Sequence, residues 1–338
     1  MNEQPAPTPS LTRRTIARGV RVFVFIAVAA AVLLLAFTAS SETLTGLAHV
    51  KWYWLAATCA LWLVASIFDG LRLAVFSRAT EHRLSLRASI EIIFIGYFMA
   101  AVTPFQVGGL PLQLYIMNSR GISPGKATSL LLMRGVVFYG LLFAAAPVVA
   151  IRLNASTAIV RVLAGYIGVI IAAGAALVIA SVAFPARFRR WHARLSQTAK
   201  PGLIRRGVIW VLDEFDEFVD GLKVYRQSHN LGWLALGLLV TVVCIVSLFG
   251  MSATLLAGLG VQTDALRVMA LNLLLTAVLL FVPTPGASGV AEVGAAGLYA
   301  AVCPKAMLGV YVVLWRLFSF YGGALVGGIL ALRHISKR

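Results

Sequence analysis

Long apolar stretches separated by short polar segments run along almost the whole chain. Several of these stretches reach or approach the ~20 residues that a helix needs to cross a bilayer. The pattern predicts an all-α polytopic membrane protein with about six full transmembrane helices. The predicted spans are Val22–Phe37, Trp52–Phe76, Ala127–Ile151, Val160–Phe184, Leu231–Leu255 and Ala306–Leu332.

Two shorter apolar stretches, Ile90–Val102 and Val268–Val282, end at breaks rich in proline and glycine. Unpaired backbone groups cost several kcal/mol in hydrocarbon, so such breaks persist only where protein or a water-filled cavity covers them. We therefore predict two re-entrant broken-helix hairpins, at residues 90–117 and 268–303. The breaks read Thr103-Pro104-Phe105-Gln106-Val107-Gly108-Gly109-Leu110-Pro111 and Pro283-Thr284-Pro285-Gly286-Ala287-Ser288-Gly289.

Charge placement predicts how these segments are oriented. Only 12% of the residues are charged and the mean hydropathy is +0.90, which excludes a soluble globular domain. The net charge is +17, but the basic residues lie mostly where the positive-inside rule expects cytoplasmic segments, which favours a membrane protein and not a nucleic-acid binder. If the first broken segment crossed fully, the basic run Arg187–Arg226 would be extracytoplasmic. We therefore expect the two hairpins to enter from opposite sides, as in an inverted repeat, with both termini cytoplasmic.

The remaining organisation is simple. We expect residues 1–17 to form a disordered cytoplasmic tail, residues 18–335 a single membrane domain and residues 185–230 a cytoplasmic connector.

The serine of Gly286-Ala287-Ser288-Gly289 has the look of a protease nucleophile, but every histidine lies in a loop or at a span end, too far to act as its base. The three cysteines are scattered. We expect no catalytic residue, no metal and no cofactor.

The two half-helices that follow the breaks are expected to begin near Pro111 and Ser288–Val290, with Ser288 as an N-cap. Their N-termini would point at the centre of the protein, and their partial positive charge and unpaired N–H groups favour an anion such as phosphate. The alternative is a pair of tight turns covered by packed neighbours.

Arg134 and Arg316 lie well inside spans, where arginine is costly and usually turns toward a partner or pathway. The alternative for Arg134 is snorkelling to the cytoplasmic face. Glu292 either pairs with Arg316 or acts as an acid that titrates or binds a cationic headgroup. Asp69 and Arg72 have the spacing of a local ion pair. The predicted substrate-binding residues are Arg134, Arg316, Glu292, Gln106, Gly108, Gly109, Gln113, Pro283, Pro285, Gly286, Ser288 and Gly289.

The two interrupted motifs and Arg134 resemble the flippase-like integral membrane family, which also forms the N-terminal membrane half of bacterial lysylphosphatidylglycerol synthases. The resemblance covers about residues 18–335 and implies a role in lipid translocation. Many members of that family carry an acid where this chain has Leu110, which implies that one of two symmetric carboxylates is absent and that the substrate differs from a cationic aminoacyl lipid. The synthases' aminoacyl-transfer domain has no counterpart before Arg338, so we expect no enzymatic activity.

The leading hypothesis is a multi-pass protein of the bacterial inner membrane that binds anionic phospholipid headgroups at a midplane site and moves them between leaflets. A secondary transporter of a small anionic solute and a non-transporting membrane scaffold are the alternatives. Membrane lipids are the expected partners, nucleic acid is not, and a homodimer is left open. The lipid, the direction of movement and its energy source are not specified by the sequence.

Overall fold

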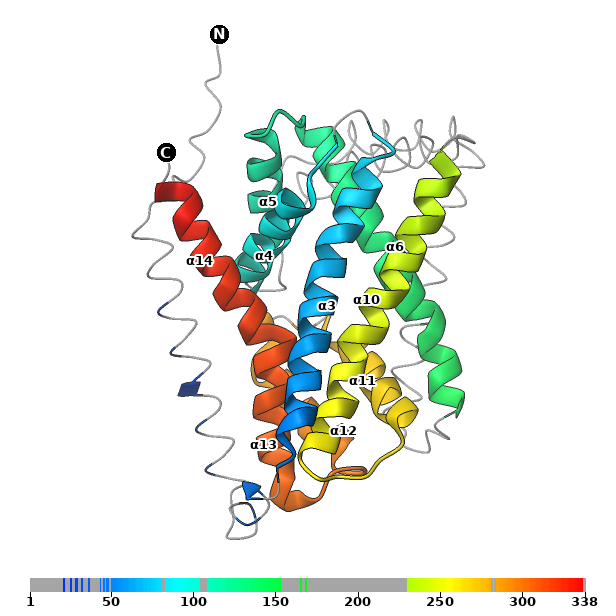
Figure 1. Cartoon of the computed structure of the whole chain (residues 1–338), viewed down its shortest axis with the longest axis vertical. Helices are drawn as coiled ribbons and strands as arrows, with labels where there is room; N and C mark the ends of the chain where they lie inside the picture. Colours follow the sequence, from blue (N-terminus) through cyan, green and yellow to red (C-terminus); the bar gives the residue numbers. More distant parts are fainter. Residues whose placement is uncertain are drawn as a thin grey trace, which may run out of the picture.

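The computed structural model describes residues 50–80, 83–103, 108–152, 230–280 and 284–336, together with residue 282 and scattered residues between 21 and 48 and at 165 and 168. All regular structure in these ranges is helical (Figure 1). The predicted spans Val22–Phe37 and Val160–Phe184 and the connector 185–230 lie almost entirely outside the described residues. The tail 1–17, Gln106 and Pro283 lie outside them as well.

Four helical segments of the described part are long and apolar enough to cross a membrane. They are α3 (Trp52–Ser77), α6 (Pro124–Arg152), α10 (Leu231–Gly258) and a continuous rod made of α13 (Lys305–Arg316), the π-turn η4 (Leu317–Tyr321) and α14 (Gly322–Ser336). Each starts and ends within a few residues of a predicted span. Leu63 of α3 and Leu239 and Val246 of α10 are exposed, as expected for helices that are apolar on all sides and face lipid.

Helices α3 and α10 pack along their length in opposite directions. The backbone N–H of Lys51, at the start of α3, donates to the carbonyl of Gly258, at the end of α10, over 2.9 Å. Deeper in the pair, the hydroxyls of Thr58 and Thr254 are 2.9 Å apart. Small polar contacts of this kind hold helices together in a medium where apolar burial alone does not.

The first broken segment forms a helical hairpin of α4 (Leu86–Val102) and α5 (Gly109–Asn118). Helix α4 ends at Thr103, which is extended because it precedes a proline. The Thr103 hydroxyl accepts the backbone N–H of Gly108 over 2.9 Å and so closes the loop between the two helices.

Helix α5 runs back along α4. Gly109 sits against the carbonyl of Gly96, where an added Cβ would be 2.9 Å from the oxygen. One turn on, the side-chain amide of Gln113 donates to the carbonyl of Ile92 over 3.3 Å. The chain therefore reverses at the break where the sequence predicted that it would.

The second broken segment forms a hairpin of α11 (Ala265–Leu279), the 3-10 turn η3 (Pro285–Ala287) and α12 (Val290–Tyr299). The turn depends on Gly286 and Gly289, whose φ angles of 59° and 84° favour glycine. The N-cap of α12 is Gly289 and not Ser288, so that prediction was wrong. The reason is that the Glu292 carboxylate accepts the Gly289 N–H over 2.7 Å and performs the capping itself.

The two hairpins occupy opposite halves of the bundle, α4 and α5 above and α11 and α12 below in Figure 1. Each has its own hydrophobic core, one centred on Phe98, Ile116 and Leu130 and the other on Leu275, Ala291 and Val312. The two hairpins meet where the end of α4 contacts η3 and the carbonyl of Ala101 lies beside Gly286. Polar groups gathered near the tips are thereby held between two apolar layers.

Basic side chains collect at one end of the bundle. Glu91 of α4 accepts Arg120, just after α5, over 2.5 Å and lies 3.3 Å from His334 of α14, which brings three helix ends together. In Figure 1 this is the upper end, where α3 also finishes and α6 begins. The charged residues of the described chain near this end include Arg78, Arg83, Arg87, Arg120, Lys126 and Arg333.

Candidate functional site

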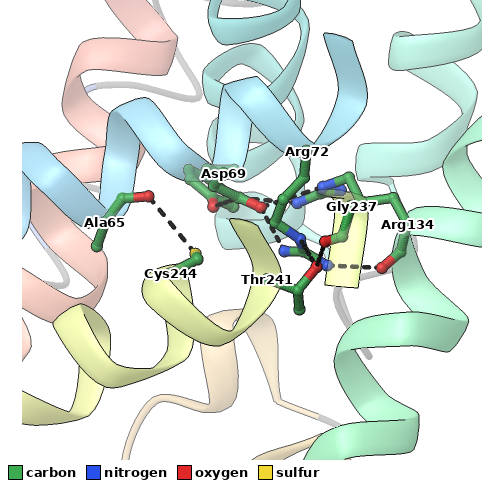
Figure 2. A network of polar contacts seen from close by, with 8 residues as sticks. Ala65, Asp69, Arg72, Arg134, Gly237, Thr241 and Cys244 are labelled. Carbon is green, nitrogen blue, oxygen red and sulfur yellow. Dashed lines mark hydrogen bonds and ion pairs between the residues drawn. The ribbon is translucent and has the colours of Figure 1, made fainter. Parts of the chain in front are cut away.

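A buried ion cluster is built around Asp69 of α3 (Figure 2). Its carboxylate accepts Nη1 of Arg72 over 2.6 Å and both Nη2 and Nε of Arg134, over 2.9 and 3.2 Å. The hydroxyl of Tyr97, on α4, also donates to it. Asp69 is 4% exposed, so a single carboxylate inside the bundle faces two guanidinium groups.

Arg72 ties three helices together. Its Nε donates to the hydroxyl of Thr241 on α10 over 3.1 Å, and its Nη2 donates to the backbone carbonyl of Arg134 on α6 over 2.6 Å. The ring of Phe138 covers the guanidinium at 4.9 Å. All three nitrogens of Arg72 are therefore engaged, and its role is to hold α3, α6 and α10 in register.

Arg134, unlike Arg72, has a side-chain nitrogen that donates to no described residue. Its Nη1 forms no hydrogen bond with any residue that the structure describes, and its side chain is 17% exposed. It lines a cavity of about 250 Å³ together with Tyr139 and Ser319. Ten residues into α6, it lies about 15 Å from the start of that helix, at 1.5 Å per residue. A guanidinium with a free N–H edge beside a cavity can bind an anionic oxygen.

A second cluster joins α12 to α13. The Glu292 carboxylate accepts Nε of Arg316 over 2.8 Å and the hydroxyl of Tyr321 over 3.1 Å, besides the N–H of Gly289. Nη2 of Arg316 donates to the carbonyl of Gly286 over 2.9 Å. This pair is balanced in charge, and it fixes the η3 turn against the rod.

Aromatic rings enclose Arg316. Its guanidinium lies 4.6 Å from the centre of the Phe320 ring and 5.4 Å from that of Tyr321, within the range of cation–π contacts. The tip of the Phe320 ring packs on Gly286, where an added Cβ would be 2.3 Å from it. Arg316 lines a smaller cavity of about 150 Å³.

The two cavities are neighbours. Both are lined by Phe138 and Tyr139 of α6, Leu248 of α10, and Ser319 and Phe320 of the π-turn. A π-turn widens a helix by one residue and often marks a functional site. The two arginine clusters therefore face adjoining cavities across one wall of mainly apolar side chains.

The structure brings the predicted residues together unevenly. Arg134 does not snorkel, because Asp69 binds it inside the bundle, and Glu292 does pair with Arg316. Gly286 lines the smaller cavity, while Pro285, Ser288 and Gly289 shape the turn beside it. Gly108, Gly109 and Gln113 hold the first hairpin closed and line neither of the two cavities. The Glu292 carboxylate already occupies the N-terminus of α12 that we expected to attract an external anion.

The spacing of Asp69 and Arg72 predicted a local ion pair, and this pair is confirmed. The additional contacts of Asp69 with Arg134 and Tyr97 were not predicted. Asp69 of α3 supplies the carboxylate that binds Arg134, from 65 positions away. The feature of the sequence that could have revealed the cluster is an acidic residue inside an apolar span, which is rare and usually marks a functional site. Among the described residues, no group of three or more histidine, cysteine or acidic side chains could hold a metal ion.

Comparison with known proteins agrees with this architecture. A curated relative, a "UPF0104 membrane protein" of Archaeoglobus fulgidus, is 26% identical over 317 residues, covering 90% of this chain and 94% of the relative. Residues 23–327 match the family described as the lysylphosphatidylglycerol synthase TM region, which confirms the resemblance that the interrupted motifs suggested. The chain therefore belongs to the family of the lysylphosphatidylglycerol synthase transmembrane region, as a multi-pass membrane protein.

Proposed function

We propose that this protein binds the phosphate of anionic membrane lipids inside the bundle and moves these lipids between leaflets. The observation that carries the proposal is the unequal charge of the Asp69 cluster. Two buried guanidinium groups share one carboxylate, beside a cavity of about 250 Å³. Among the described residues the cluster holds one positive charge in excess, and an unpaired buried charge is costly. A bound anion would remove that cost.

Arg134 is the residue best suited to make the contact. Arg134 lines the cavity and its Nη1 donates to no described residue, whereas each side-chain nitrogen of Arg72 already donates, to Asp69, Thr241 or a backbone carbonyl. Arg316, which lines the adjoining cavity and is paired with Glu292, would form a second binding position. A cluster with balanced charge binds an anion more weakly than a cluster with surplus positive charge. The two cavities would therefore bind the same anion with different affinities.

The arrangement of the hairpins supports a transport role. We propose that α4–α5 and α11–α12 are re-entrant, entering the membrane from opposite faces, with the basic end of the bundle in the cytoplasm. Irregular backbone at membrane depth is tolerated where it is covered by protein or lines a cavity, and both tips lie between the two cores. Alternation between the halves would open the cavities to each side in turn.

A small anionic solute is the second candidate, because cavities of about 250 and 150 Å³ fit a headgroup or a free anion better than a whole lipid. The family name, which refers to a lipid synthase, favours the lipid. Lipid chains would then remain outside the bundle while the headgroup passes through it.

The test is reconstitution into vesicles with headgroup-labelled phosphatidylglycerol in one leaflet, and with entrapped glycerol phosphate in a parallel set. The variants R134Q and R316A should slow lipid exchange at least tenfold, while R267Q, at an exposed position of α11, should leave it unchanged. Movement of glycerol phosphate without lipid exchange would favour the solute transporter. Lipid exchange in R134Q and R316A at the wild-type rate would contradict the proposed site.

A further inference from the structure

We propose a second binding site, for the phosphate of an anionic lipid, in a cavity at the basic end of the bundle. This cavity has a volume of about 790 Å³ and lies between the start of α4 and the end of α14. It is separate from the two internal cavities and shares no lining residue with them. Its lining consists of Leu86, Arg87, Ile90, Glu91, Leu330, Arg333 and His334.

The cavity arises from the way the two helices cross. They touch most closely at Gly327, where an added Cβ would overlap the carbonyl of Phe94. Nearer the middle of the bundle, Gly323 packs against the ring of Tyr97. Toward its C-terminus α14 leans away from α4 in Figure 1, and the cavity lies between this part of α14 and the first turns of α4.

The lining carries surplus positive charge. Among its described residues Glu91 is the one acid, and it binds Arg120 over 2.5 Å and lies 3.3 Å from Nδ1 of His334. Arg87 and Arg333 are the two arginines of the described lining, and both are exposed. The chemistry of the lining is that of a phosphate site.

The other half of the lining is apolar, and this feature points to a lipid. Leu86, Ile90 and Leu330 line the same cavity as the arginines, and Leu86 is 39% exposed. A free phosphate ion gains no affinity from this apolar surface. A lipid would place its phosphate on the arginines and its glycerol and first methylenes on the leucines. Basic pockets between helices at the cytoplasmic side are suited to anionic headgroups.

The inference rests on the proposed function, since it supplies a docking site for the lipid at the leaflet where transport would begin or end. It is distinct from that function in its residues. Arg87 and Arg333 lie on helix ends at the surface, while Arg134 and Arg316 lie inside the bundle.

The experiment is native mass spectrometry of the purified full-length protein, titrated with phosphatidylglycerol and, separately, with phosphatidylcholine. The variant R87A/R333A should bind phosphatidylglycerol about 10- to 30-fold more weakly, since each basic residue near a membrane surface contributes about 1 kcal/mol toward an anionic lipid. The control R78A/R83A removes the same charge from the same end but outside the cavity, and it should lose much less. Equal losses in both variants would overturn the proposal, because general attraction would then explain the binding.

Two further measurements separate the remaining outcomes. Glycerol phosphate should not displace the lipid from wild-type protein, and displacement would show a site for a free anion and overturn the assignment to lipid. The vesicle assay is then run on R87A/R333A. Loss of lipid binding with transport that recovers at high phosphatidylglycerol content supports a docking role. Wild-type protein that binds lipid through Arg87 and Arg333 but moves none would refute the proposed function while leaving this site in place.

Discussion

Arg134 of α6 and Asp69 of α3 are joined by two hydrogen bonds, of 2.9 and 3.2 Å, although 65 positions separate them in the chain. Their side chains are 17% and 6% exposed. This bond connects the helix after the first hairpin to the helix before it. Within the part of the chain that the structure describes, this carboxylate compensates one of the two arginines and leaves the other in excess.

Removal of that carboxylate should destabilise the protein strongly. In D69N two buried guanidinium groups would lack a counter-charge, and breaking a buried ion pair costs about 3–5 kcal/mol. The matched change E91Q weakens an ion pair whose side chains are 27% and 26% exposed, and it should cost at most about 1 kcal/mol. Thermal unfolding in detergent, followed by circular dichroism, compares the two. Equal melting temperatures would show that the Asp69 cluster does not stabilise the bundle.

Glu292 and Arg316 should behave as one unit. Each single change, E292Q or R316M, leaves a lone buried charge, whereas the double variant leaves none. We therefore expect the double variant to be more stable than the sum of the two losses predicts, by about 1–3 kcal/mol. The measurement is a double-mutant cycle on unfolding free energies. Additive losses would mean that the 2.8 Å contact contributes no coupling.

Substitution of Gly286 tests the geometry of the second tip. G286A places a Cβ at a φ of 59° and against the ring of Phe320, so it should cost about 2–4 kcal/mol. The control is G297A in α12, where an added Cβ meets nothing within 4 Å. That change should stabilise the helix by up to about 1 kcal/mol. Thermal stability of the two variants should move in opposite directions, and a tolerated G286A would contradict the observed turn.

Cys303, in the loop between α12 and α13, should react slowly with thiol reagents. Burial raises the pKa of its thiol to about 11, so little thiolate exists at pH 8 and the reactive form grows only as the pH rises. In a C59A/C244A background, maleimide labelling of Cys303 at pH 8 should be roughly 100-fold slower than that of an unperturbed thiol. A301C with C303A provides this reference from an exposed position of the same loop. Equal rates would show that the thiol is open to water.

Much of the fold follows from local sequence. A run of apolar residues long enough to span a bilayer has few alternatives to a helix, so α3, α10 and the α13–α14 rod lie close to their predicted limits. The breaks were equally visible, because proline lacks a backbone N–H and glycine adopts conformations that other residues rarely adopt, whatever the surroundings are. The predicted site was less complete. Glu292 and Arg316 were identified together, since both lie in or just after the second hairpin.

The hydrophobic pattern by itself determined that this chain is a helical membrane protein, where its helices run and where two of them break. The two interrupted motifs also indicated the family to which the chain belongs. Only the tertiary structure decided which charges meet. The contacts of Arg134 with Asp69, of Arg72 with Thr241 and of Phe320 with Gly286 join different helices, and no local rule of spacing specifies such pairs. The physical reason is that helix packing sets the partner of a buried charge, while sequence alone reveals only that a partner is needed.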